Sequence, residues 1–108
     1  MAEIEEASVC ETKDDGTVTI TGGGSLTFMN AAEFGEKLKQ ASLTADAVIV
    51  DMRSVQFIDT QIVQDLGRAG ITLIGRKKRL RVLVSETTYP RRVMKISGYD
   101  TIMDIEVE

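Results

Sequence analysis

Residues 47–60 read AVIVDMRSVQFIDT, and this stretch decides the fold. Its first four residues, Ala47–Val50, are apolar without alternation, which is typical of a strand covered by helices on both faces of a parallel sheet. We expect this strand to end at Asp51 and a short connector to follow over Met52–Ile58. The pair Asp59-Thr60 then begins a helix.

The predicted helix carries apolar residues at helical spacing to about Lys78, and its outer face is polar. One of its faces should therefore pack on the sheet. A second apolar strand follows at Leu80–Val84, and we expect both apolar strands in the centre of the sheet. The helix side chains predicted to be buried are Ile62, Leu66, Ala69 and Leu73.

Segments before this stretch predict a hairpin and a further helix. The β-prone runs Ser8–Thr12 and Thr17–Thr21 flank a turn containing Asp15-Gly16, so they should pair antiparallel. Cys10, in the first run, is interpreted as a small buried side chain. Gly22–Gly24 is interpreted as a flexible bend, because three glycines free the backbone.

The helix after the glycines is predicted to begin at Asn30 and to keep its apolar spacing to about Leu43. Asn30 suits the N-cap, Glu33 suits the returning position of a capping box, and Met29 is placed to pack on Phe34.

The last part of the chain predicts a third helix and a short strand. Pro90 suits the first turn of that helix and Gly98 its end. A final strand is expected at about Ile102–Ile105. The apolar residues predicted to form the buried stripe of the third helix are Val93, Met94 and Ile96.

This order of elements predicts a single α/β domain over residues 1–108. Its sheet would be mixed and mostly parallel, with four to five strands, an N-terminal antiparallel hairpin and helices packed against it.

Length and composition exclude several classes of protein. The chain has 108 residues, 43% of them apolar and 28% charged, which indicates one ordinary globular domain. No apolar run approaches the roughly 18 residues of a membrane helix, and the N-terminal stretch is acidic, unlike a signal peptide. We therefore expect a cytoplasmic protein without direct membrane insertion.

Residue usage also limits the chemistry. The chain has no histidine and one cysteine, which excludes zinc sites and histidine-dependent catalysis. Asp51 and Asp59 are the acids nearest a strand end, but no set of positioning and electrophilic groups accompanies them. Basic clusters such as Arg76–Arg79 suit a helix C-terminus better than a nucleic-acid site. We predict no enzymatic activity, no cofactor, no metal and no nucleic-acid partner.

Thr60 is the residue with the most specific chemical possibility. A phosphate on a hydroxyl at a helix start would meet unsatisfied amides and the positive end of the helix dipole. The same position also suits an ordinary N-cap supplied by Asp59 or Thr60. From the residues alone, both interpretations stay open.

Three stretches together resemble the STAS domain, the family of anti-sigma-factor antagonists and of the cytoplasmic tails of sulfate-type anion transporters. The resemblance covers about residues 8–106. It rests on residues 47–60, which are similar to the family's strand, connector and phosphoacceptor, and on two further stretches: GSLTFMNAAEF (24–34) and RRVMKISGYD (91–100). Asp59-Thr60-Gln61-Ile62 is similar to the Asp-Ser or Asp-Thr pair of stressosome-type members.

The resemblance implies a non-enzymatic interaction module switched by phosphorylation of Thr60. Its implied partner is an anti-sigma factor or a serine/threonine kinase of the anti-sigma type, and other STAS proteins are a further class. Two alternatives remain: a constitutive scaffold or transporter-tail module that is never phosphorylated, and a weak nucleotide- or anion-binding module that uses Gly22–Gly24. The residues implied to bind the partner around Thr60 are Asp59, Gln61, Ser25 and Thr27.

Overall fold

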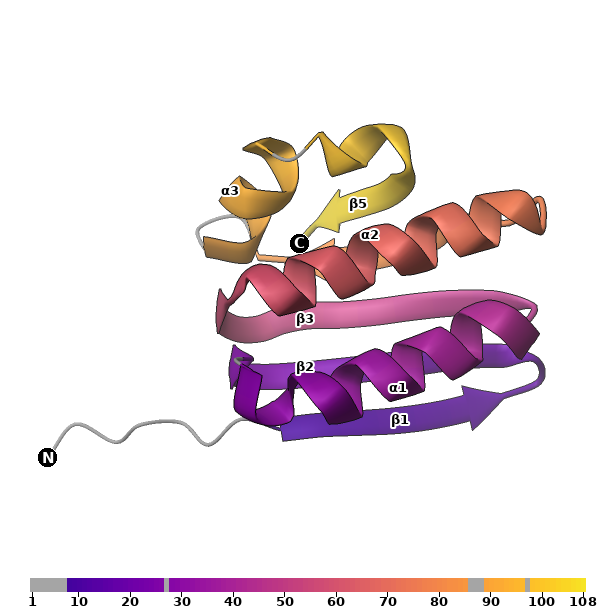
Figure 1. Ribbon diagram of the computed structural model, residues 1–108, viewed down its shortest axis with the longest axis horizontal. Helices are drawn as coiled ribbons and strands as arrows, with labels where there is room; N and C mark the ends of the chain where they lie inside the picture. Colours follow the sequence, from indigo (N-terminus) through magenta and orange to yellow (C-terminus); the bar gives the residue numbers. More distant parts are fainter. Residues whose placement is uncertain (1–7, 27, 86–88, 97) are drawn as a thin grey trace, which may run out of the picture.

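The computed structural model describes residues 8–26, 28–85, 89–96 and 98–108 (Figure 1). These residues form one α/β domain with a five-stranded sheet, three α-helices and one 3-10 helix. The elements are, in chain order, β1 (Ser8–Asp14), β2 (Thr17–Leu26), α1 (Phe28–Thr44), β3 (Ala47–Ile58), α2 (Thr60–Gly75), β4 (Leu80–Val84), α3 (Tyr89–Ile96), the 3-10 helix η1 (Tyr99–Thr101) and β5 (Met103–Val107).

The order of strands in the sheet is the order of strands in the chain, β1-β2-β3-β4-β5. Strands β1 and β2 form the predicted antiparallel hairpin, and every later pair is parallel. The predicted fold class is therefore confirmed, with β3 in the centre of the sheet.

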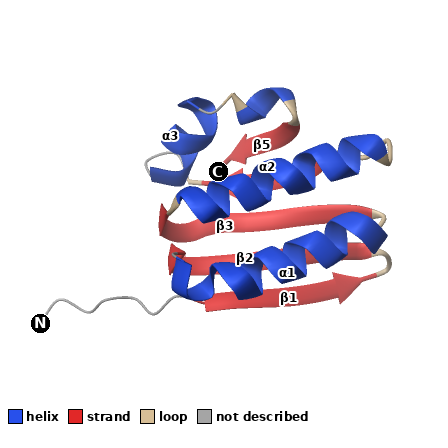
Figure 2. Cartoon of the chain, in the orientation of Figure 1, coloured by secondary structure: helices blue, strands red, loops and turns tan. Residues whose placement is uncertain are grey.

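Helices α1 and α2 lie side by side over one face of the sheet (Figures 1 and 2). On that face Ile20, Val50 and Val82 are fully buried, whereas Ile49 and Arg81 on the opposite face reach solvent. The prediction of helices on both faces was wrong. Each crossover steps to the next strand in the same direction, and right-handed crossovers of that kind place their helices on one side.

Strand β3 is longer than predicted, because it continues through Met52–Ile58 instead of ending at Asp51. Its partner β2 also continues, through Gly22–Gly24, so the glycines belong to a strand and the predicted bend was wrong. The pairing slips between Thr21 and Gly23 and again between Gly24 and Ser25. Such bulges bend a strand without ending it.

Helix α1 begins at Phe28, two residues before the predicted cap at Asn30. The predicted capping box with Glu33 was therefore wrong. The reason is that Asn30 is the third residue of α1, whereas an N-cap residue stands before the first helical residue.

The core between helices and sheet contains the predicted face of α2. Ile62, Leu66, Ala69 and Leu73 are all buried, as are Phe34 and Leu38 of α1, so this prediction is confirmed. In α3, Met94 is buried and Val93 is partly buried against the core, but Ile96 is 87% exposed because it is the last helical residue. Cys10 is exposed, contrary to prediction, since the neighbouring Val9 takes the core side of edge strand β1.

Helix α2 also packs closely against η1, at a glycine. The Tyr99 hydroxyl donates a hydrogen bond to the Val63 carbonyl oxygen at 2.9 Å. A Cβ at Gly67 would lie only 2.6 Å from that hydroxyl oxygen. Gly67 therefore allows the tyrosine to reach the helix backbone.

We predict that Gly67→Ala lowers the free energy of unfolding by about 1–3 kcal/mol, because Tyr99 has to move and lose its bond. Gly75→Ala is the matched control in the same helix, where an added Cβ meets nothing within 4 Å. It should leave stability unchanged or raise it by about 0.5–1 kcal/mol. Urea denaturation measures both variants, and equal stabilities would contradict the close contact at Gly67.

Candidate functional site

Asp59 directly precedes α2 and has extended backbone angles. Its Oδ1 accepts a hydrogen bond from the Ile62 amide at 3.2 Å. Asp59 is thus the N-cap, which settles the choice between Asp59 and Thr60. Its own amide donates to the Leu26 carbonyl oxygen at 3.2 Å. The cap therefore ties the start of α2 to the end of β2.

Thr60 is the first residue of α2, and its side chain is exposed. The first backbone bond of the helix runs from the Val63 amide to the Asp59 carbonyl oxygen at 3.2 Å. The amides of Thr60 and Gln61 come before that bond and have no partner within the helix. An anion on the Thr60 hydroxyl would lie at the positive end of the helix dipole, as the sequence suggested.

We predict that Asp59→Ala lowers the free energy of unfolding by about 0.5–2 kcal/mol, since it removes the cap bond to the Ile62 amide. Asp59→Asn is the matched variant, because asparagine caps a helix as well as aspartate does. It should cost only a few tenths of a kcal/mol by the same scale. Thermal denaturation separates the cases, and equal losses would assign the effect to the charge of Asp59 rather than to its hydrogen bond.

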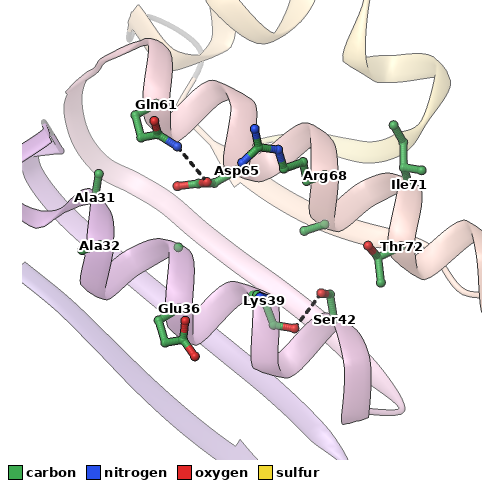
Figure 3. Close-up of a pocket in the computed structure, with 12 residues that line it drawn as sticks. Ala31, Ala32, Glu36, Lys39, Ser42, Gln61, Asp65, Arg68, Ile71 and Thr72 are labelled. Atoms are coloured by element: carbon green, nitrogen blue, oxygen red, sulfur yellow. Dashed lines mark hydrogen bonds between the residues drawn. The ribbon is translucent and has the colours of Figure 1, made fainter.

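Gln61, the third predicted residue here, faces a groove between α1 and α2 (Figure 3). Its Nε2 donates to Asp65 Oδ1 at 3.2 Å. The groove has a volume of about 860 Å³. It is lined by small and charged side chains, among them Ala31, Gly35, Glu36, Lys39, Asp65 and Arg68.

The other two residues predicted to bind the partner, Ser25 and Thr27, are described only in part. Ser25 pairs in register with Phe57, close to the start of α2, but its side chain lies outside the described part of the structure, and Thr27 lies outside the described residues altogether. The structure brings Asp59, Thr60 and Gln61 together, and it places the backbone of Ser25 near them.

Two residues near this site were missed by the sequence reasoning. Phe57 is 42% exposed at the end of β3, just before the Asp59 cap. The other is Asp65, whose pKa is raised mainly by burial, against the opposing effects of the Gln61 hydrogen bond and the Arg68 charge. Its spacing of four residues from Gln61 on a helix was the available signal.

Asp51 has a structural role on the open face of the sheet. Its carboxylate accepts from Arg53 Nη2 at 2.8 Å and from the Arg53 amide at 3.1 Å. The side-chain hydrogen bond from Arg53 lowers the pKa of Asp51. Asp51 therefore binds Arg53 within β3, and neither Asp51 nor Asp59 lines the groove.

The described residues include no group of three or more carboxylate or thiol side chains that could hold a metal ion. Among the described helices, none is both long enough and apolar enough to cross a membrane.

A family model described as "Mlab, STAS domain" matches residues 9–105. The chain belongs to the STAS domain family. The matched range includes the whole of α2 and at least part of each of the five strands. Asp59 and Thr60 therefore lie within the matched residues of this STAS domain. Among curated proteins, none matches the sequence significantly.

Solved structures show the same fold. The STAS domain resembles an anti-sigma factor antagonist from Mycobacterium paratuberculosis with a TM-score of 0.82 and 15% identity, over 98% of this chain and 90% of that one. It resembles the anti-sigma factor antagonist SpoIIAA in its unphosphorylated form with a TM-score of 0.77 and 20% identity, over 94% and 90%. For the phosphorylated Bacillus SpoIIAA the values are 0.74 and 19%, over 94% and 93%.

Proposed function

We propose that this STAS domain is a cytoplasmic, non-enzymatic interaction switch of the anti-sigma-factor antagonist type. A serine/threonine kinase of the anti-sigma type phosphorylates Thr60, and the modification controls binding of the kinase or of an anti-sigma factor. The observation that carries the proposal is the exposed Thr60 hydroxyl directly after the Asp59 cap, at the helix start of a STAS domain. Bacillus SpoIIAA, which has the same fold, has been solved in a phosphorylated form.

The proposed docking surface surrounds Thr60. It consists of Asp59 and Gln61 on α2, Ser25 and Thr27 before α1, and the half-exposed Phe57 at the end of β3. Such a mixture of one large apolar side chain with a polar rim is usual in protein interfaces. A phosphate added at its centre would have to be desolvated when the partner binds.

The experiment that tests phosphorylation is mass spectrometry after incubation with a serine/threonine kinase of the anti-sigma type. We expect phosphate on Thr60 in the wild-type protein and none in Thr60→Val. Thr44→Val is the matched control, because Thr44 is likewise an exposed threonine at a helix end and should not affect labelling. Phosphate found only at other residues would reject the switch and leave the constitutive scaffold.

The nucleotide- or anion-binding alternative has lost its main support. It needed a flexible glycine loop, whereas Gly22–Gly24 are part of the paired strand β2. We expect purified protein neither to bind nor to hydrolyse nucleotides, and turnover that Asp59→Asn abolishes would refute the non-enzymatic assignment.

A further inference from the structure

The groove between α1 and α2 contains a carboxylate that points across it. Asp65 belongs to α2, and its Oδ2 lies 2.8 Å from the position that a Cβ would take at Gly35 of α1. The absence of a side chain at Gly35 therefore makes the space that the carboxylate fills. Figure 3 shows Asp65 and Gln61 together on the α2 side, opposite Ala31 and Ala32.

Asp65 has no cation within ion-pair distance among the described residues, although it is one of the more enclosed acids. Its hydrogen-bond donor is Gln61 Nε2. Arg53, Arg79 and Arg81, by contrast, each form an ion pair with a carboxylate on the open face of the sheet. A partly buried carboxylate without a cation has lost hydration that a bound cation would replace.

Among the charged residues that line the groove, Asp65 is the acid that lies beside Gln61. Glu36 of α1 points away from α2 (Figure 3). The charge of Arg68 acts on Asp65 from beyond ion-pair distance and lowers the pKa of its carboxyl, against the larger effect of burial. A basic side chain of a partner would therefore meet Asp65 next to Gln61.

We propose that the groove receives an arginine side chain from the protein that docks over Thr60, and that Asp65 is the anion that binds it. The partner in this proposal is the one in the proposed function, on which the inference rests. The Gln61–Asp65 hydrogen bond joins two side chains and leaves an acceptor on each of them, Gln61 Oε1 and Asp65 Oδ2, without use. A planar guanidinium, with its fork of donors, matches two adjacent acceptors better than a lysine ammonium does.

The probe for this site is N-acetyl-arginine amide, titrated into the isotopically labelled wild-type protein and followed by NMR. We expect saturable shifts of the Gly35, Gln61 and Asp65 amides and a lower pKa of the Asp65 carboxyl when the probe is bound. The neutral isostere N-acetyl-citrulline amide should bind about tenfold more weakly. Equal shifts with both probes, or shifts only outside the groove, would overturn the proposal.

Variants separate binding by Asp65 from a structural role. Asp65→Asn should weaken probe binding about tenfold while leaving the unfolding midpoint at pH 7 unchanged or higher, because a neutral side chain suits the enclosed site better than an ionised one. The midpoint difference should shrink as pH falls through the raised pKa of Asp65, where the wild-type carboxyl is also neutral. Asp100→Asn, an exposed acid on η1, is the control that should bind normally. A destabilised Asp65→Asn that binds the probe like wild type would mean a structural role.

The same titration on Thr60→Val distinguishes this inference from the proposed function. That variant cannot be phosphorylated, yet it should bind the arginine probe as wild type does. If the kinase phosphorylates Thr60 of the wild-type protein but the wild-type protein does not bind the arginine probe, only the groove proposal is rejected. If the wild-type protein binds the arginine probe but the kinase does not phosphorylate Thr60, only the phosphorylation switch is rejected.

Discussion

Replacing Leu66 with alanine should lower the free energy of unfolding by about 2–5 kcal/mol. Leu66 is fully buried in the middle of α2, between that helix and the sheet. Its removal would leave a cavity that the packed strands β3 and β4 cannot fill without moving. Urea denaturation followed by circular dichroism measures the loss, and the slope m should stay the same.

The control for this variant is Ile71→Ala, also in α2. Ile71 is 63% exposed, so its truncation should change stability by no more than about 0.5 kcal/mol. A loss at Leu66 as small as that at Ile71 would show that α2 does not bury this face.

Phosphorylation of Thr60 should weaken binding of the partner at least about tenfold, which is about 1.4 kcal/mol. The phosphate adds roughly −1.5 to −2 charge beside the Asp59 carboxylate, and docking would have to desolvate it. Stability of the free protein should change by less than about 1 kcal/mol, because Thr60 is exposed and a helix N-terminus favours an anion. The modification would then act on the interface and not on the fold.

Calorimetry with the two forms of the protein and the same partner measures this effect. Thr60→Val should bind like the unmodified form, and Thr60→Glu should bind more weakly than Thr60→Val but better than the phosphorylated form, since it carries one negative charge. If phosphorylated and unmodified protein bind with the same affinity, the domain is a scaffold whose Thr60 does not regulate it.

Helix α2 was predictable because its apolar residues recur at one period and its cap stands directly before them. The second half of β3, Met52–Ile58, was not predictable in this way. Its buried residues Met52, Val55 and Ile58 are three apart, a spacing that fits neither an alternating strand nor a continuous apolar run. The slips in the pairing with β2 produce that spacing, and they depend on a neighbouring strand that local patterns do not report.

The residues of the candidate site likewise differ in whether the sequence could predict them. Asp59, Thr60 and Gln61 are consecutive, so a local motif located them. The groove needs Gly35 of α1 opposite Asp65 of α2, two residues that only the packing of the helices brings together. Phe57 was assigned to a connector, and its exposure beside the cap follows from the longer strand.

The matching order of strands in the chain and in the sheet has a consequence for synthesis on the ribosome. Each strand that emerges adds to an edge already present, and none has to insert between two that have paired. Each parallel pair joins strands that are consecutive in the chain, so its formation waits only for the helical connection between them. The hairpin, α1 and β3 can therefore assemble while the rest of the chain is still in the exit tunnel, and β5 closes the sheet last.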